Sequence, residues 1–317
     1  MIKKITYCVT GLLCCVALCG CSYTIKDSER IYRDDLSRAK NISNLFGYHK
    51  VHDSKAPKGY DGDGSFLWNS TVWAANLDGA ANINGFLPGI SGWGAVGVGL
   101  GLGLLQRALT PPEMHECSSL IGYYPAQQAK SLDEARTKFV EEATNALVKA
   151  TKKQLPNASV NVIAHKSVPQ SFMIEPFYYT AIHIVDKKMG CLSDAEAKRR
   201  DDTCLIIVKA TNVTGPDLLP KMLSTDEMGY KISPTDHGNS LITWGSTAQK
   251  IDLPKLYAST APYMPKNSFF YVASQKNLKG EITPPFIVET NRVNFFIKPN
   301  RKINSLSKIE QYKKCFR

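Results

Sequence analysis

The cysteines are the side chains of this sequence with the widest range of possible chemistry. Five of the nine lie in the first 21 residues (Cys8, Cys14, Cys15, Cys19 and Cys21), and the other four are Cys117, Cys191, Cys204 and Cys315. A thiol can be acylated, can ligate a metal or can be oxidised to a disulfide, and the cellular compartment selects among these reactions. The start of the chain, which bears on the compartment, therefore has to be interpreted first.

The N-terminal segment has the pattern of an export signal. Lys3 and Lys4 precede an apolar stretch that runs from Ile5 to Leu18. A transmembrane helix needs about 20 apolar residues, so this stretch is too short to span a bilayer. Its length and its basic flank are those of a secretory signal. The sequence therefore predicts an exported protein.

Leu18-Cys19-Gly20-Cys21 resembles the lipobox of bacterial lipoproteins, in which a leucine and two small residues precede the acylated cysteine. The resemblance implies that residues 1–20 are removed as a signal peptide and that Cys21 carries the lipid, which anchors the protein stably when it is multiply acylated. In lipoproteins of Gram-negative bacteria an Asp after that cysteine usually means retention in the inner membrane, so Ser22 implies the outer membrane. Cys19 is slightly larger than the residue usually found there. An ordinary signal peptide with incidental cysteines is the alternative.

The four remaining cysteines predict two disulfides, because their number is even and the chain is expected to be exported. Cys191 and Cys204 flank a short polar loop between two strand-like segments, which favours a Cys191–Cys204 bond. The other pair would then be Cys117 and Cys315, which would fix the C-terminal tail to the globular part. A zinc site is the alternative, but no C-x-x-C pair is present in the sequence.

Gly92-Trp93-Gly94-Ala95-Val96-Gly97 is a literal G-x-G-x-x-G, the pattern of loops that bind dinucleotide phosphates. Such a loop follows a strand directly and opens a helix, with an acidic residue about 20 positions further on. Here Pro88-Gly89 predicts a turn instead of a strand, and no βαβ unit is visible. The pattern therefore predicts no nucleotide site.

The same glycines have a spacing that suits packing in a membrane. Residues 79–106 contain no charge and nine glycines in 28 positions. Glycines four residues apart share one helical face, where backbones can approach closely. The sequence therefore predicts a glycine-rich segment that packs against copies of itself or inserts in the membrane as a hairpin, through Gly85, Gly89, Gly97, Gly99, Gly101 and Gly103. A flexible loop, a buried segment of a soluble domain and a strand of small residues are the alternatives.

The lipobox together with this segment resembles the surface-exclusion lipoproteins of conjugative plasmids, the TraT type. The matching positions are Leu18 to Cys21 and Gly85 to Leu105, about a fifth of the chain, and the rest does not align. The resemblance implies an outer-membrane homo-oligomer that is linked to conjugation or secretion proteins.

Catalytic motifs are missing from the sequence. Asp236, His237 and Ser240 are residue types of hydrolases, but no G-x-S-x-G elbow accompanies them. The sequence also lacks H-E-x-x-H, a P-loop and a recognisable nucleic-acid module. The prediction is therefore a protein with no catalytic residue, no metal, no cofactor and no nucleic-acid partner.

The chain is basic, with a formal net charge of +11 over 317 residues, or +9 once Lys3 and Lys4 are removed with the leader. Residues 298–317 hold seven Lys or Arg and one Glu. A basic surface suits anionic partners. A monomeric lipoprotein that binds an anionic envelope ligand through this region is thus an alternative function, and a lipid-tethered periplasmic hydrolase is a second alternative.

The remaining elements predict an α+β fold, with one amphipathic helix on a mostly antiparallel sheet. Ser131-Leu132-Asp133-Glu134 is a capping box that begins a helix, and Pro156 ends it near Leu155. Strand-like runs are expected at 159–165, 177–185, 204–211, 268–274, 285–290 and 293–298. The expected domains are a signal peptide (1–20), an acylated N-terminus and tether (21–65), a glycine-rich hairpin (66–110) and a disulfide-bonded α+β domain with a basic tail (111–317).

Overall fold

The computed structural model describes residues 32–55, 64–67, 116–166, 178–210, 212–224, 226–234, 240–278, 280 and 282–299. The lipobox, the glycine-rich segment and most of the basic tail lie outside these residues, so the structure does not test the predictions for them.

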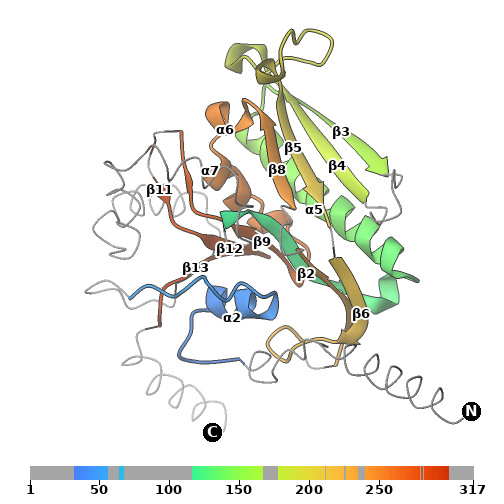
Figure 1. The fold of residues 1–317 in the computed structure, drawn as a ribbon, viewed down its shortest axis with the longest axis vertical. Helices are drawn as coiled ribbons and strands as arrows, with labels where there is room; N and C mark the ends of the chain where they lie inside the picture. Colours follow the sequence, from blue (N-terminus) through green and yellow to red (C-terminus); the bar gives the residue numbers. More distant parts are fainter. Residues whose placement is uncertain are drawn as a thin grey trace, which may run out of the picture. The chain divides into compact units, whose positions relative to one another are not determined.

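The larger of two main sheets has seven antiparallel strands in the order β1-β13-β12-β9-β2-β7-β6 (Figure 1). Its central strands are apolar on both faces: in β9, Phe269 and Tyr271 belong to one core cluster and Phe270 and Val272 to the other. The strands are β1 (Ser65–Leu67), β2 (Ser119–Pro125), β6 (Asn212–Leu218), β7 (Met228–Ser233), β9 (Ser268–Val272), β12 (Phe286–Glu289) and β13 (Arg292–Phe295).

The second sheet has four antiparallel strands in the order β3-β4-β5-β8. A separate two-stranded ribbon pairs β10 with β11. The strands are β3 (Ser159–Lys166), β4 (Tyr178–Val185), β5 (Cys204–Lys209), β8 (Leu241–Gly245), β10 (Gln275–Lys276) and β11 (Ile282–Thr283).

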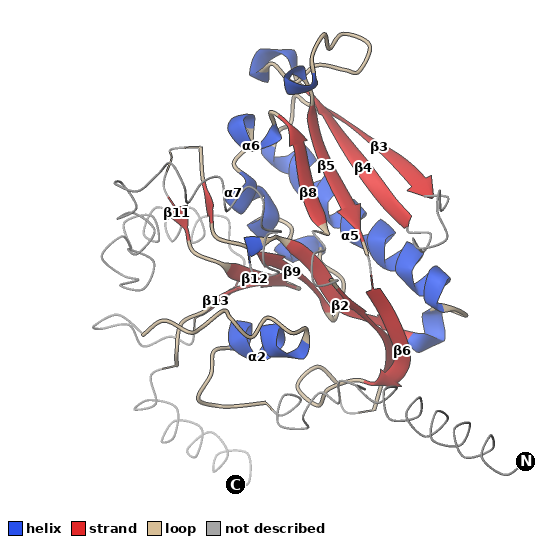
Figure 2. Cartoon of the chain, viewed as in Figure 1, coloured by secondary structure: helices blue, strands red, loops and turns tan. Residues whose placement is uncertain are grey.

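Helix α5 (Leu132–Gln154) packs against both sheets (Figure 2). Ser131 caps its N-terminus by accepting a hydrogen bond from the Glu134 backbone N–H, and Lys152 and Lys153 lie in its last turn, where cations favour the helix dipole. Buried side chains of α5 share one hydrophobic core with residues of both sheets. The shorter helices are α6 (Thr247–Lys250), α7 (Leu253–Ala258) and single 3-10 turns at Ala126–Gln128, Lys187–Met189, Arg200–Asp202 and Ala261–Tyr263.

Helix α2 (Arg38–Leu45) covers the opposite face of the seven-stranded sheet (Figure 1). Its residues Ala39, Ile42 and Leu45 are buried in one cluster with Ile121 and Phe269. The prediction of a tether over residues 21–65 is therefore wrong for residues 32–55, which belong to the globular unit. The predicted boundary at residue 65 is also wrong, because it falls inside β1, where Ser65 lies opposite Asn294 of β13.

Two polar contacts hold α2 in place. The Arg38 guanidinium donates two hydrogen bonds to the nearly buried Glu289 carboxylate of β12, at 2.5 and 2.6 Å. Ser37 donates from its backbone N–H and its hydroxyl to Asp53, at 2.7 and 2.5 Å. Burial raises the pKa of Asp53, and these hydrogen bonds from Ser37 oppose that shift. Because these contacts satisfy polar groups at the start of α2, a sequence with few apolar residues can still pack there.

The predicted α+β fold with a mostly antiparallel sheet is confirmed. The helix after the capping box is confirmed as α5, and the six strand-like runs correspond to β3, β4, β5, β9, β12 and β13. Strands β1, β2, β6, β7, β8, β10 and β11 were not expected. Among the described residues, no helix is long and apolar enough to cross a membrane.

Candidate functional site

The four-stranded sheet has one covered face and one outer face. Ile182, Ile206 and Val208 are fully buried in the core that contains α5, so they define the covered face. Side chains alternate along a strand, and residues directly opposite each other in an antiparallel pair share a face. The neighbours of these residues along each strand therefore point outward.

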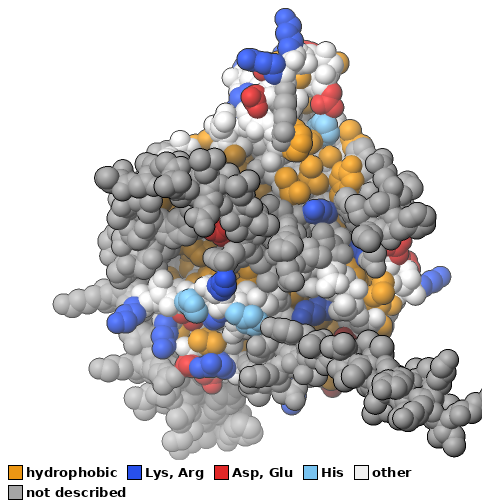
Figure 3. Space-filling model, in the orientation of Figure 1, with side chains coloured by type: hydrophobic (Ala, Val, Ile, Leu, Met, Phe, Trp, Pro, Cys, Tyr) orange, Lys and Arg blue, Asp and Glu red, His pale blue; other side chains and the backbone are white. Residues whose placement is uncertain are grey.

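Cross-strand register arranges the outer residues in three rows. The first row is Asn161, His183, Leu205 and Trp244, the second is Ile163, Ala181, Ile207 and Ile242, and the third is Tyr179 and Lys209. The second row is entirely apolar. Ile163 is 41% exposed and Trp244 39% exposed. In Figure 3 hydrophobic side chains gather over these strands. We call this surface, made by the three rows, the outer face.

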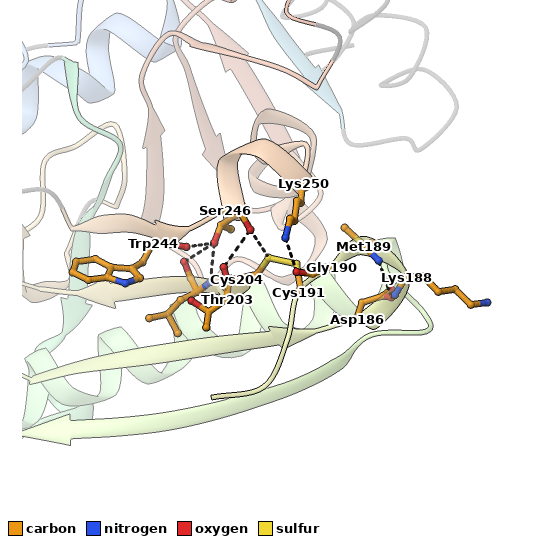
Figure 4. The surroundings of a disulfide bond; sticks show 12 residues. Asp186, Lys188, Met189, Gly190, Cys191, Thr203, Cys204, Trp244, Ser246 and Lys250 are labelled. Carbon is orange, nitrogen blue, oxygen red and sulfur yellow. Dashed lines mark hydrogen bonds between the residues drawn. A yellow bond between two sulfur atoms is a disulfide. The ribbon is translucent and has the colours of Figure 1, made fainter. Parts of the chain in front are cut away.

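A disulfide fixes the loop above the first row (Figure 4). Cys191 and Cys204 are bonded with their Cα atoms 5.3 Å apart, and the bond closes the loop that leads into β5. Hydrogen bonds hold the loop from α6 as well: the Ser246 backbone N–H donates to the Thr203 carbonyl at 3.0 Å, and Lys250 Nζ donates to the Gly190 carbonyl at 2.5 Å. The Trp244 ring points away from the disulfide in Figure 4.

An open hollow of about 490 Å³ lies between this loop and the first row of the outer face. His183 Nδ1 lies 3.5 Å from the Asp194 carboxylate there. The hollow is lined by His183, Asp194, Ala197, Lys198, Arg199, Thr203, Leu205 and Trp244. Two cations beside an aromatic ring can hold an acidic group and a flat apolar surface together. The hollow therefore extends the outer face with polar contacts at one end.

Lys209 lies in the third row, at the opposite end of the outer face. Burial lowers the pKa of this half-buried lysine, because a charged ammonium loses water there. Lys209 therefore places a partly desolvated cation beside the apolar second row.

A second open hollow, of about 510 Å³, lies beside the first half of α5 and holds two acidic side chains next to each other, Glu141 and Glu142. The Tyr124 hydroxyl donates to Glu142 at 3.3 Å, and the Tyr178 hydroxyl donates to Glu141 at 3.0 Å. Burial raises the pKa of Glu142, while burial and the neighbouring glutamates raise the pKa of Tyr124 to about 12. Sequence reasoning missed these pairs, because only the long-range packing of β2 and β4 on α5 brings the partners together.

The structure bears on only part of the predicted site. The Cys191–Cys204 bond is confirmed. Cys117 is buried, and its predicted partner Cys315 lies outside the described residues, so this pair stays a prediction. Cys21 and the glycines at 85, 89, 97, 99, 101 and 103 also lie outside them. The described residues contain no group of His, Cys, Asp and Glu that could hold a metal ion.

No family model, no curated protein and no solved structure matches this chain. Its function therefore has to be argued from its own residues.

Proposed function

We propose that this chain is an oligomeric structural lipoprotein of the Gram-negative outer membrane. The acylated Cys21 anchors it, and its α+β domain acts by binding proteins of a conjugation or secretion assembly, including copies of itself. Surface exclusion is the sharpest form of this proposal. It assigns the chain no reaction and no cofactor.

The observation that carries the binding role is the outer face. Soluble domains rarely expose contiguous apolar surface without a use for it, and such surfaces mark sites where proteins dock. Here Ile163, Ala181, Ile207 and Ile242 form one apolar row with one residue from each strand, and Trp244 lies in the adjacent row. Ile163 and Trp244 are exposed, whereas Ala181 is buried. Aromatic side chains at the centre of an interface contribute strongly to binding. A row of this kind supports docking of a protein surface on the sheet.

Export is supported by the disulfide together with the lipobox. Structural disulfides persist in oxidising compartments and are rare in the cytosol. Cys191 and Cys204 are both buried at the base of one loop, which fits a structural bond. The lipobox pattern at Leu18 to Cys21 then supplies the anchor.

The anchor is tested with the full-length chain in Gram-negative cells that are labelled with a palmitate analogue. We expect the wild-type chain to carry the label in the outer-membrane fraction. Cys21→Ser should lose the label and leave that fraction, because no other residue in the proposal carries lipid. The matched variant Cys19→Ser keeps a small residue inside the lipobox and should behave as the wild type. Label retained by Cys21→Ser, or lost equally by Cys19→Ser, would contradict acylation at Cys21.

A further inference from the structure

Among the strands of the described residues, β3 is an edge of the four-stranded sheet. The four consecutive residues Asn161 to Ala164 are exposed, Val162 to 44% and Ile163 to 41%. At the centre of the strand, Val162 on the covered face and Ile163 on the outer face are thus both apolar and solvent-accessible. An edge strand also carries outward backbone N–H and C=O groups on about half of its residues, which form a template for another strand.

The other edges of the two main sheets have features that discourage pairing. Strand β6 contains Gly215-Pro216 and a register irregularity between Thr214 and Asp217. Strand β1 is three residues long, and β8 is five residues long and ends at Gly245 before α6. Proline, irregular register and short length are the means by which proteins protect sheet edges. Strand β3 has none of them: it is eight residues long, it pairs with β4 in unbroken register, and residues 159–164 contain no charge and no proline.

We propose that β3 pairs antiparallel with β3 of a second copy of this chain, about a two-fold axis at Val162. The two four-stranded sheets then form one continuous eight-stranded sheet. This inference rests on the proposed function, since it names the interface through which the oligomer forms.

The sequence of β3 is compatible with itself in this register. Val162 lies opposite Val162 of the second copy, Val160 opposite Ala164, and Asn161 opposite Ile163. The two residues of each pair belong to the same face of the sheet. The covered faces of the two copies therefore lie on one side of the joined sheet, and the outer faces lie on the other side. Cross-strand pairs of β-branched residues stabilise a sheet.

Charge favours the antiparallel arrangement over the parallel one. His165 and Lys166 are the basic residues of β3, and both lie at its end. Antiparallel pairing places the two basic ends on opposite sides of the axis, whereas parallel pairing in register would set Lys166 against Lys166, which is destabilising. A two-fold interface of this kind is closed, and closed two-fold dimers are the commonest symmetric assemblies. Closure also joins the two outer faces into one larger docking surface.

The register is tested by single cysteines in the full-length, membrane-anchored chain. Val162→Cys should give a disulfide-linked dimer that the wild type lacks, because directly opposite Cβ atoms lie about 5 Å apart and small shifts bring them within bonding reach. Ala164→Cys alone should give no linked dimer. Residue 164 lies two positions from the axis in each copy, so the two introduced cysteines are about 13 Å apart along the strands. Val160→Cys and Ala164→Cys combined should again give the dimer. Leu218→Cys, 60% exposed on the protected edge β6, is the matched control and should give none.

Failure of this interface can be distinguished from failure of the proposed function. If Val162→Cys gives no dimer, or no more than Leu218→Cys, while the wild-type chain still has a multimeric native mass, the β3 interface is wrong and the oligomer stands. Linkage of Val162→Cys to a different protein, with none between copies, also overturns self-pairing. Val162→Lys places two cations against each other and should reduce the native mass of the oligomer, whereas Leu218→Lys should not. An unchanged native mass for Val162→Lys overturns the inference as well.

Discussion

Replacing Phe139 with alanine should reduce the free energy of unfolding by about 3–5 kcal/mol. Phe139 is 1% exposed and lies on α5, in the core that the helix shares with both sheets. Its ring packs so closely on β2 that a Cβ added at Gly122 would lie 2.9 Å from its Cζ atom. Truncation would leave a cavity at the point where the two sheets meet the helix, and neither sheet can move in to fill it without separating from the other contacts of α5.

The prediction is measured by urea unfolding of the purified full-length chain, followed by circular dichroism. Leu132→Ala is the matched control on the same helix, because Leu132 is 42% exposed, and it should change the free energy of unfolding by less than about 0.5 kcal/mol. A loss below about 1 kcal/mol for Phe139→Ala would show that α5 is not the common core of the two sheets.

Removing the disulfide with Cys191→Ser and Cys204→Ser together should cost about 3 kcal/mol, because the bond restricts a loop of 13 residues in the unfolded chain. The loop also lines the hollow over the first row of the outer face, so binding at that end should weaken as well. The hydrogen bonds from Ser246 and Lys250 remain, and they hold only the ends of the loop.

Reduction of a chain that carries Cys315→Ser, in which the second predicted bond cannot form, provides the internal control. A reductant should lower the stability of that chain to the level reached when Cys191→Ser and Cys204→Ser are added to it, and it should leave the chain with those added substitutions unchanged. If the variant unfolds at the wild-type urea concentration, the bond does not contribute to the fold and its support for export is lost.

The local features of this fold were predictable where one pattern dominates. The capping box at Ser131 and the apolar periodicity behind it specify α5 almost to the residue. Strands β4, β5 and β9 are rich in β-branched and aromatic residues, so their runs identify them. The Cys191–Cys204 bond followed from two cysteines that flank one polar loop.

Other elements depend on contacts that no local pattern contains. Helix α2 was predicted as part of a tether because its sequence is polar. Its place in the fold depends instead on the hydrogen bonds from Arg38 to Glu289, 251 residues away, and on the burial of Ala39, Ile42 and Leu45 against the seven-stranded sheet. Strand β6 contains a Gly-Pro pair, which is typical of a turn, so the sequence did not predict a strand there.

The outer face was not predictable for a related reason. The run Cys204-Leu205-Ile206-Ile207-Val208 is apolar throughout, so it does not show which side a helix covers. That β3 is an exposed edge follows from strand order, which is a long-range property of the fold.

The native mass of the detergent-extracted, lipidated full-length chain tests the central claim, that this protein assembles with itself in the outer membrane. We predict a mass of at least two protomers after the contribution of the detergent is subtracted, where one protomer is the 35.0 kDa chain less its signal peptide of residues 1–20. A mass of one protomer, found for chain that carries its lipid and its Cys191–Cys204 bond, would contradict the assembly and with it the pairing of β3.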